Sequence, residues 1–61
     1  MQKIDLTILA RELRAEITLL EQLRQGETVK GLQLNQDGIT LEWIEKQIDF
    51  NQRLLEALNN D

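Results

Sequence analysis

The side chains in this sequence that could do chemistry are mostly carboxylates, and two pairs of them are spaced one helical turn apart. Glu12 lies four residues before Glu16, and Glu45 lies four residues before Asp49. On a helix this spacing brings two carboxylates to one face, as general acid–base catalysis or metal binding requires. Carboxylates on helix surfaces are common, and we interpret both pairs as solvated or flanking charge. Glu16 falls within an apolar arc, where we expect it to pair with an arginine across an interface.

Nucleophilic and metal chemistry lack the residues that they usually need. The chain contains no Cys, His or Ser, so it offers no activated nucleophile with an oriented base and no soft ligand for zinc. Residues 35–38 have oxygen ligands spaced as in the middle of a calcium loop, but Gln33 and Ile44 stand where the first carboxylate and the bidentate glutamate belong. The sequence therefore predicts a protein that is not an enzyme and has no catalytic residue, metal, cofactor or small-molecule substrate.

The charge balance is acidic and argues against two classes of partner. Seven basic residues against eleven acidic residues give a net charge of -4, which repels nucleic-acid backbones and anionic lipid surfaces. The basic residues are scattered, and no apolar run approaches the ~20 residues that cross a membrane. No basic region followed by an apolar stretch begins the chain. We therefore expect a cytoplasmic protein that binds neither nucleic acid nor membrane.

Residues 5–25 are expected to form the first helix that positions these side chains. Asp5 is the predicted N-cap, with Ile4 and Leu9 forming a hydrophobic staple across it, and Arg24 and Gly26 mark the end. Apolar residues recur at spacings of three and four, which indicates one apolar face. These are Leu6, Leu9, Leu13, Ile17 and Leu20.

Residues 41–58 are expected to form the second helix, capped by Thr40 and stapled by Ile39 and Ile44. Its seam has heptad spacing, which predicts packing against another helix. The seam positions are Leu41, Ile44, Ile48, Asn51, Leu55 and Leu58. Asn51 is the polar residue in this seam, and we expect it to set register or orientation at some cost in stability. The opposite face carries two favourable i,i+4 ion pairs, Glu42 with Lys46 and Asp49 with Arg53.

The fifteen residues 26–40 join the two helices, and their pattern leaves two structures open. They form either an ordered loop or a minimal β-hairpin with its turn at residues 35–38, flanked by residues 32–34 and 39–41. Strands of three residues are unstable by themselves, so we favour the loop. We expect Val29, Leu32 and Leu34 to cover one end of the core.

The fold class is therefore all-α: one domain over residues 1–61, built as an antiparallel helical hairpin. A chain of 61 residues buries a small core, and with no disulfide or zinc site the remaining aid to stability is self-association. Two hairpins that pair through the seams of both helices would form an antiparallel four-helix bundle. We predict this homodimer, with the apolar residues of the first helix and the seam of the second as its core.

A second apolar stripe consists of Trp43, Phe50 and Leu54, roughly 100° around the second helix from its seam. It is expected either to be buried in the dimer or to dock another protein, since aromatic residues often anchor interfaces. The predicted function is a non-enzymatic protein–protein interaction module, a small homodimeric adaptor or regulator or the small subunit of a larger assembly. The alternative is an acidic inhibitor, similar to an antitoxin, that blocks a basic surface of its partner.

Overall fold

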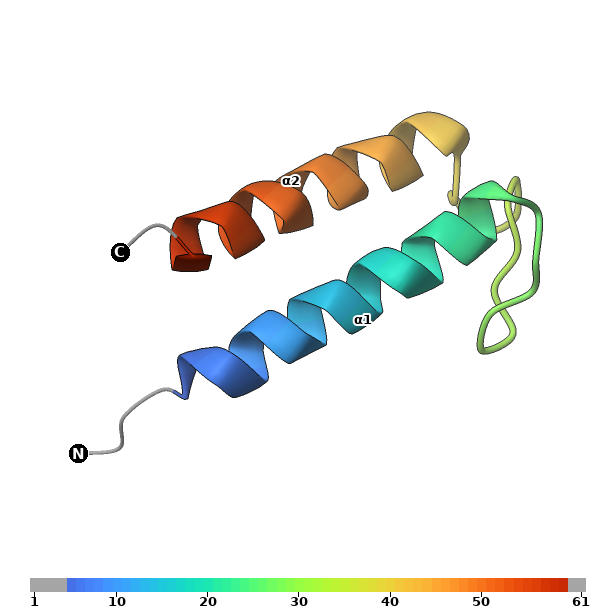
Figure 1. The fold of residues 1–61 in the computed structure, drawn as a ribbon. Coiled ribbons are helices and arrows are strands. Elements are labelled where there is room, and N and C mark those ends of the chain that lie inside the picture. Colours follow the sequence, from blue (N-terminus) through green and yellow to red (C-terminus); the bar gives the residue numbers. More distant parts are fainter. Residues whose placement is uncertain (1–4, 60–61) are drawn as a thin grey trace.

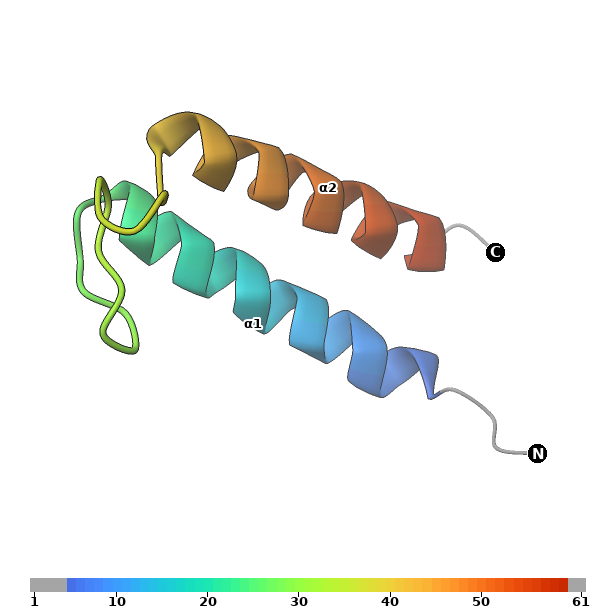
Figure 2. The same cartoon turned by 180° about the vertical axis from the view of Figure 1, so that it is seen from behind.

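The computed structural model describes residues 5–59 and contains two α-helices, α1 (Leu6–Arg24) and α2 (Leu41–Asn59), each of 19 residues. The helices lie side by side and antiparallel, joined at one end by residues 25–40, which we call the connection (Figure 1). The view from behind shows the same pair, with the start of α1 and the end of α2 together at the other end (Figure 2). No strand occurs in residues 5–59, so the predicted all-α helical hairpin is confirmed.

The start of α1 is fixed by its predicted cap. The Asp5 carboxylate accepts hydrogen bonds from the backbone N–H groups of Thr7 at 3.0 Å and Ile8 at 3.4 Å. These bonds satisfy two of the donors that a helix N-terminus leaves without partners. Ile4, the other half of the predicted staple, lies outside the described residues.

The end of α1 closes with a Schellman motif. The Glu27 N–H donates to the Gln22 carbonyl and the Gly26 N–H to the Leu23 carbonyl, both at 3.0 Å. Gly26 has a φ of 92°, in the left-handed region that this motif requires and that glycine tolerates best. The predicted end of the helix near Arg24 and Gly26 is therefore confirmed.

The start of α2 is also fixed by a side-chain cap. The Thr40 hydroxyl accepts a hydrogen bond from the Trp43 N–H at 3.1 Å. Ile39 and Ile44, on either side of this cap, are both buried in one apolar cluster, as the predicted staple requires. The cap and the staple together hold the entry of α2 against the hydrophobic core.

The connection begins with a tight turn of two central residues. Val29 and Leu32 exchange two backbone hydrogen bonds of 2.9 Å around Lys30 and Gly31, which have φ values of 51° and 80°. Positive φ at both central residues is the geometry of a type I′ turn. This single β-bridge lies earlier in the chain than the hairpin that the sequence suggested.

A second turn of the same kind leads into α2. The Ile39 N–H donates to the Gln36 carbonyl at 2.9 Å around Asp37 and Gly38, which have φ values of 52° and 81°. The Asn35 N–H also donates to the Ile39 carbonyl, at 2.6 Å. Residues 32–34 and 39–41 do not pair as strands, so the ordered loop is the alternative that forms.

The hydrophobic core lies at the connection end of the helix pair. Its members are Leu20 and Leu23 of α1, Val29 and Ile39 of the connection, and Ile44 and Ile48 of α2. Leu34 packs against this cluster and Val29 is part of it, but Leu32 is 43% exposed. The prediction that Leu32 covers the core is wrong, because the tight turn at Lys30 and Gly31 carries it back to the rim of the core.

The terminal end of the pair is packed less completely. The helices lie further apart there, and no connection covers them (Figures 1 and 2). Leu13 and Ala10 are buried, Leu58 is half-buried and Leu6 is 46% exposed. The hairpin thus has a dense end and a sparse end.

Candidate interaction surface

The residues predicted to form a shared dimer core fall into three groups in the single chain. Leu13, Leu20, Ile44 and Ile48 are buried; Leu9, Ile17, Asn51, Leu55 and Leu58 are half-buried; Leu6 and Leu41 are exposed. The burial within one chain comes from the packing of α1 on α2 and on the connection. These stripes therefore form the hairpin's own core before any second chain is added.

The seam position of Leu41 predicted that it lies in the core, and this prediction is wrong. It is 47% exposed, and Ile39, immediately before the helix cap, fills the connection end of the core instead. The sequence reasoning also omitted Ala10 and Leu23 from the apolar stripe, although both are buried. Each lies three residues from a predicted seam leucine, so helical spacing was the signal that could have found them.

Three of the four exposed large apolar side chains of α2 lie on one stripe, and Leu41 lies off it. Trp43, Phe50 and Leu54 are 43%, 58% and 41% exposed. With Gln47 they are spaced four, three and four residues apart, the heptad spacing of a helix that packs against another helix. The stripe is parallel to the buried seam and roughly 100° around α2 from it. It is therefore only partly covered within residues 5–59.

Part of α1 lies on the same side of the molecule as this stripe. A pocket of about 250 Å³ at the connection end is lined by Trp43 together with Glu16, Leu19 and Leu32. Counting about 100° per residue from Glu16 and Leu19 places Leu9 and Glu12 on this side too. We call this surface the Trp43 face; it consists of Leu9, Glu12, Glu16 and Leu19 of α1 with Trp43, Gln47, Phe50 and Leu54 of α2.

The charged groups of the hairpin divide into paired and unpaired sets. Each ion pair among residues 5–59 joins two residues of the same helix. In α1, Arg24 pairs with Glu21 at 3.8 Å. In α2, Lys46 pairs with Glu42 at 3.2 Å and Arg53 with Asp49 at 3.1 Å. The two pairs of α2 are those predicted from i,i+4 spacing, and both are well exposed, so each stabilises the helix only slightly. Neither Glu12 nor Glu16 takes part in an ion pair of the described chain.

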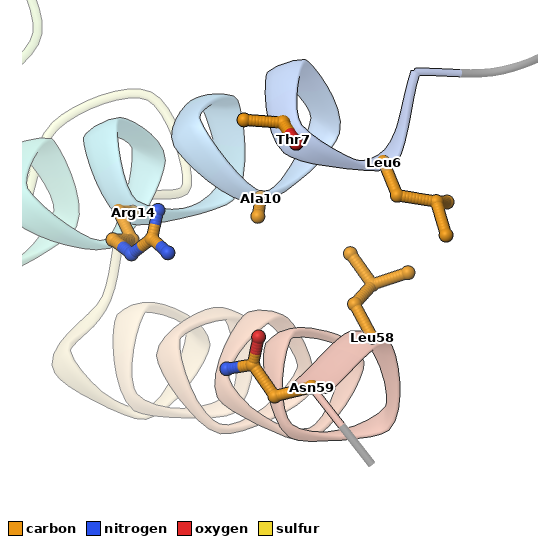
Figure 3. A pocket seen from close by; sticks show the side chains of 6 residues that line it. All are labelled: Leu6, Thr7, Ala10, Arg14, Leu58 and Asn59. Atoms are coloured by element: carbon orange, nitrogen blue, oxygen red, sulfur yellow. The ribbon is translucent and has the colours of Figure 1, made fainter. Parts of the chain in front are cut away.

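A second pocket, of about 190 Å³, lies at the terminal end (Figure 3). Its lining residues are Leu6, Thr7, Ala10, Arg14, Leu58 and Asn59. Leu6 and Leu58 extend toward one another from the two helices, and the small Ala10 side chain leaves space beside them (Figure 3). With one cation, one hydroxyl and no carboxylate, this lining offers no acid–base pair. We interpret the pocket as a gap in the packing of the separated helix ends.

The described residues give little support for site chemistry of other kinds. Residues 5–59 contain no buried polar or charged side chain and no cluster of three metal-ligating side chains. Neither helix within this range is long and apolar enough to cross a membrane.

Comparison with known proteins identifies no relative: no family model, characterised protein or solved structure matches the chain. The function is therefore argued from the Trp43 face, which carries the exposed Trp43, Phe50 and Leu54.

Proposed function

We propose that this chain is a non-enzymatic protein–protein interaction module that first pairs with a second copy of itself. In this proposal two hairpins form a four-helix bundle that serves as an adaptor, a regulator or the small subunit of a larger assembly. The observation that carries the proposal is the exposed heptad stripe of Trp43, Phe50 and Leu54. A single hairpin leaves this stripe in water.

Energetics support covering this stripe. Removing apolar surface from water contributes about 25 cal/mol per Å², and aromatic side chains contribute the most area per residue. A 61-residue chain with a core at only one end has little stability in reserve. Covering Trp43 and Phe50 with a second chain would therefore add a large fraction of the stability of the fold.

The acidic inhibitor remains the second candidate because Glu12 and Glu16 lie on the Trp43 face without a cationic partner among residues 5–59. A basic partner surface would neutralise both carboxylates. Salt dependence separates the candidates, because screening weakens an exposed charge interface and leaves an apolar interface largely unchanged. We favour the self-pairing module because three large apolar side chains of the face, Trp43, Phe50 and Leu54, are exposed.

Sedimentation equilibrium of the full chain tests self-pairing, with Phe50→Asp as the disruptive variant. We expect a dimer for the parent chain and a helical monomer for Phe50→Asp, because a carboxylate cannot be covered by an apolar partner without large cost. Gln52→Asp is the matched control: it adds the same charge on the exposed polar side of α2, and it should remain dimeric.

Trp43 emission provides a second readout, because it is the only tryptophan in the chain. Dilution through the dissociation range should shift its emission to the red and make it easier to quench. A folded monomer at high micromolar concentration, with a melting temperature that dilution leaves unchanged, would refute the proposal.

A further inference from the structure

We propose that Asp37 is a site of covalent self-modification, at which its side chain forms a cyclic imide with the backbone nitrogen of Gly38 and reopens as isoaspartate. Asp37 is the only aspartate in the sequence that is followed by glycine. It lies in the turn that leads from the connection into α2, and both residues of the pair are exposed. The modification is independent of the proposed self-pairing.

The reaction needs water and no other reactant. The Gly38 nitrogen attacks the side-chain carboxyl carbon of Asp37, a C–N bond forms, and the carboxyl hydroxyl leaves as water with the amide proton. A second water then opens the imide at one of its two carbonyl carbons. Opening at the main-chain carbonyl leaves the backbone running through the side chain, as isoaspartate, and opening at the other carbonyl restores aspartate. Nothing is oxidised or reduced, and the mass of the chain is unchanged.

The Gly38 nitrogen is accessible to this attack. Within residues 5–59 its N–H donates no hydrogen bond, and the Asp37 carboxylate accepts no hydrogen bond and joins no ion pair. Gly38 has no side chain to obstruct the carboxyl group. Apart from its two neighbours in the chain, no heavy atom lies within 4 Å of the place where a Cβ would stand.

The backbone of Asp37 already has part of the geometry of the imide. A planar imide ring eclipses the Gly38 nitrogen with the Cβ of Asp37, which sets ψ at about −120°, as at the first central residue of a type II′ turn. That position also has positive φ, and Asp37 has a φ of 52°. Rotation of the single peptide between Asp37 and Gly38 therefore converts the type I′ turn into the type II′ turn that the ring requires.

The residues around this peptide offer little resistance to its rotation. The φ of Gly38 changes from 81° to a negative value, and glycine adopts both signs about equally readily. The Ile39 N–H donates to the Gln36 carbonyl at 2.9 Å, and a type II′ turn allows the same hydrogen bond. The turn can thus reach the reactive geometry while α2 stays folded.

The two aspartates at the helices are in a different position. Asp5 uses its carboxylate to cap α1 and is followed by Leu6. Asp49 lies inside α2, is paired with Arg53 and is followed by Phe50, whose nitrogen is bonded within the helix. Among residues 5–59, the modification should therefore occur in the connection alone.

Isoaspartate should weaken the connection end of the hairpin. It adds one atom to the backbone of a turn with two central residues, and the Asn35 N–H and the Ile39 carbonyl bond to each other at 2.6 Å outside that turn. Ile39 is buried in the core and comes immediately before the Thr40 cap of α2. The isomerised chain should therefore melt about 4 °C or more below the parent chain, since a small loss of stability has that effect in a domain of this size.

Mass spectrometry of the full chain after warm incubation in heavy-oxygen water at mildly acidic pH tests the site. Hydrolysis of the imide adds one heavy oxygen, and trypsin separates the three aspartates before residue 54 into peptides 4–11, 31–46 and 47–53. We expect heavy oxygen and isoaspartate in peptide 31–46 and neither in the other two. An unlabelled peptide 31–46 from the folded chain would overturn the proposal, and its labelling in urea would show that the folded turn prevents ring closure.

Two variants test the route through the imide. Asp37→Asn should form the same imide several times faster, because ammonia leaves in place of water. Asp37→Glu would need a six-membered ring and should stay unlabelled. Equal labelling of the parent chain and Asp37→Glu would overturn the proposal.

The effect on stability is measured on the separated isomers. The isoaspartate and aspartate chains are melted at equal concentration, and the isoaspartate chain should melt lower. Equal melting temperatures would refute the loss of packing at the connection end.

Discussion

The two ends of the hairpin are built from the same two helices, yet they differ in how well they are packed. At the connection end, Val29 and Ile39 complete the cluster that includes Ile44. At the terminal end, Leu6 and Leu58 meet beside a gap, and no further segment of residues 5–59 covers them. The comparison teaches that two amphipathic helices bury little by themselves. A third element, even an irregular one, is what turns their contact into a core.

The largest expected effect is a difference between the two ends in how much free energy of unfolding is lost when a side chain is shortened to alanine. Ile44→Ala removes the most buried side chain of the connection end and should cost about 2–5 kcal/mol. Leu58→Ala removes as many carbon atoms as Ile44→Ala but should cost only about 1 kcal/mol, because Leu58 is already partly in water. Urea unfolding followed by circular dichroism measures both. Equal costs would show that the two ends are packed alike.

A smaller effect should separate two residues of the connection. Val29→Ala should cost about 1–2 kcal/mol because Val29 is part of the core cluster. Leu32→Ala should change the free energy of unfolding of the monomer by less than about 0.5 kcal/mol, since Leu32 is exposed. Thermal melts at a concentration below that of dimerisation provide the comparison. A larger loss for Leu32→Ala would indicate that the rim of the core supports the fold.

The smallest expected effect is at Asn51, which lies between the two ends and is half-buried. Asn51→Leu should stabilise the hairpin by about 1 kcal/mol by replacing a polar side chain in the seam with an apolar one. It should also permit oligomers other than the dimer, because a single seam asparagine restricts register. Melting and sedimentation measurements check both expectations. A variant that is destabilised with unchanged mass would contradict the placement of Asn51 in the seam.

The sequence predicts the helices well because their ends are set by local chemistry. Asp5 and Thr40 cap through their own side chains, and Gly26 supplies the left-handed residue that ends α1. These signals need no knowledge of the rest of the chain.

The connection and the candidate site are less accessible from the sequence. The residue types indicate a turn at residues 35–38, and the chain does turn around Asp37 and Gly38. They give no such sign of the earlier turn, where Lys30 adopts the positive φ that residues other than glycine rarely do. Helical spacing also identifies two adjacent stripes on α2 without stating which of them meets α1. The exposed position of Leu41 depends on Ile39 filling the core, and that follows from the path of the connection.

The location of the core has a consequence for the order in which the chain folds. All six core residues lie within residues 20–48, so the cluster can assemble while the first turns of α1 and the last turns of α2 are still unformed. Contacts between residues close in sequence require little loop-closure entropy, and helical chains with such contacts fold in microseconds to milliseconds. The hairpin should therefore nucleate at the connection and close toward the termini. Unfolding would run in the reverse direction, with the Leu6 and Leu58 ends separating first.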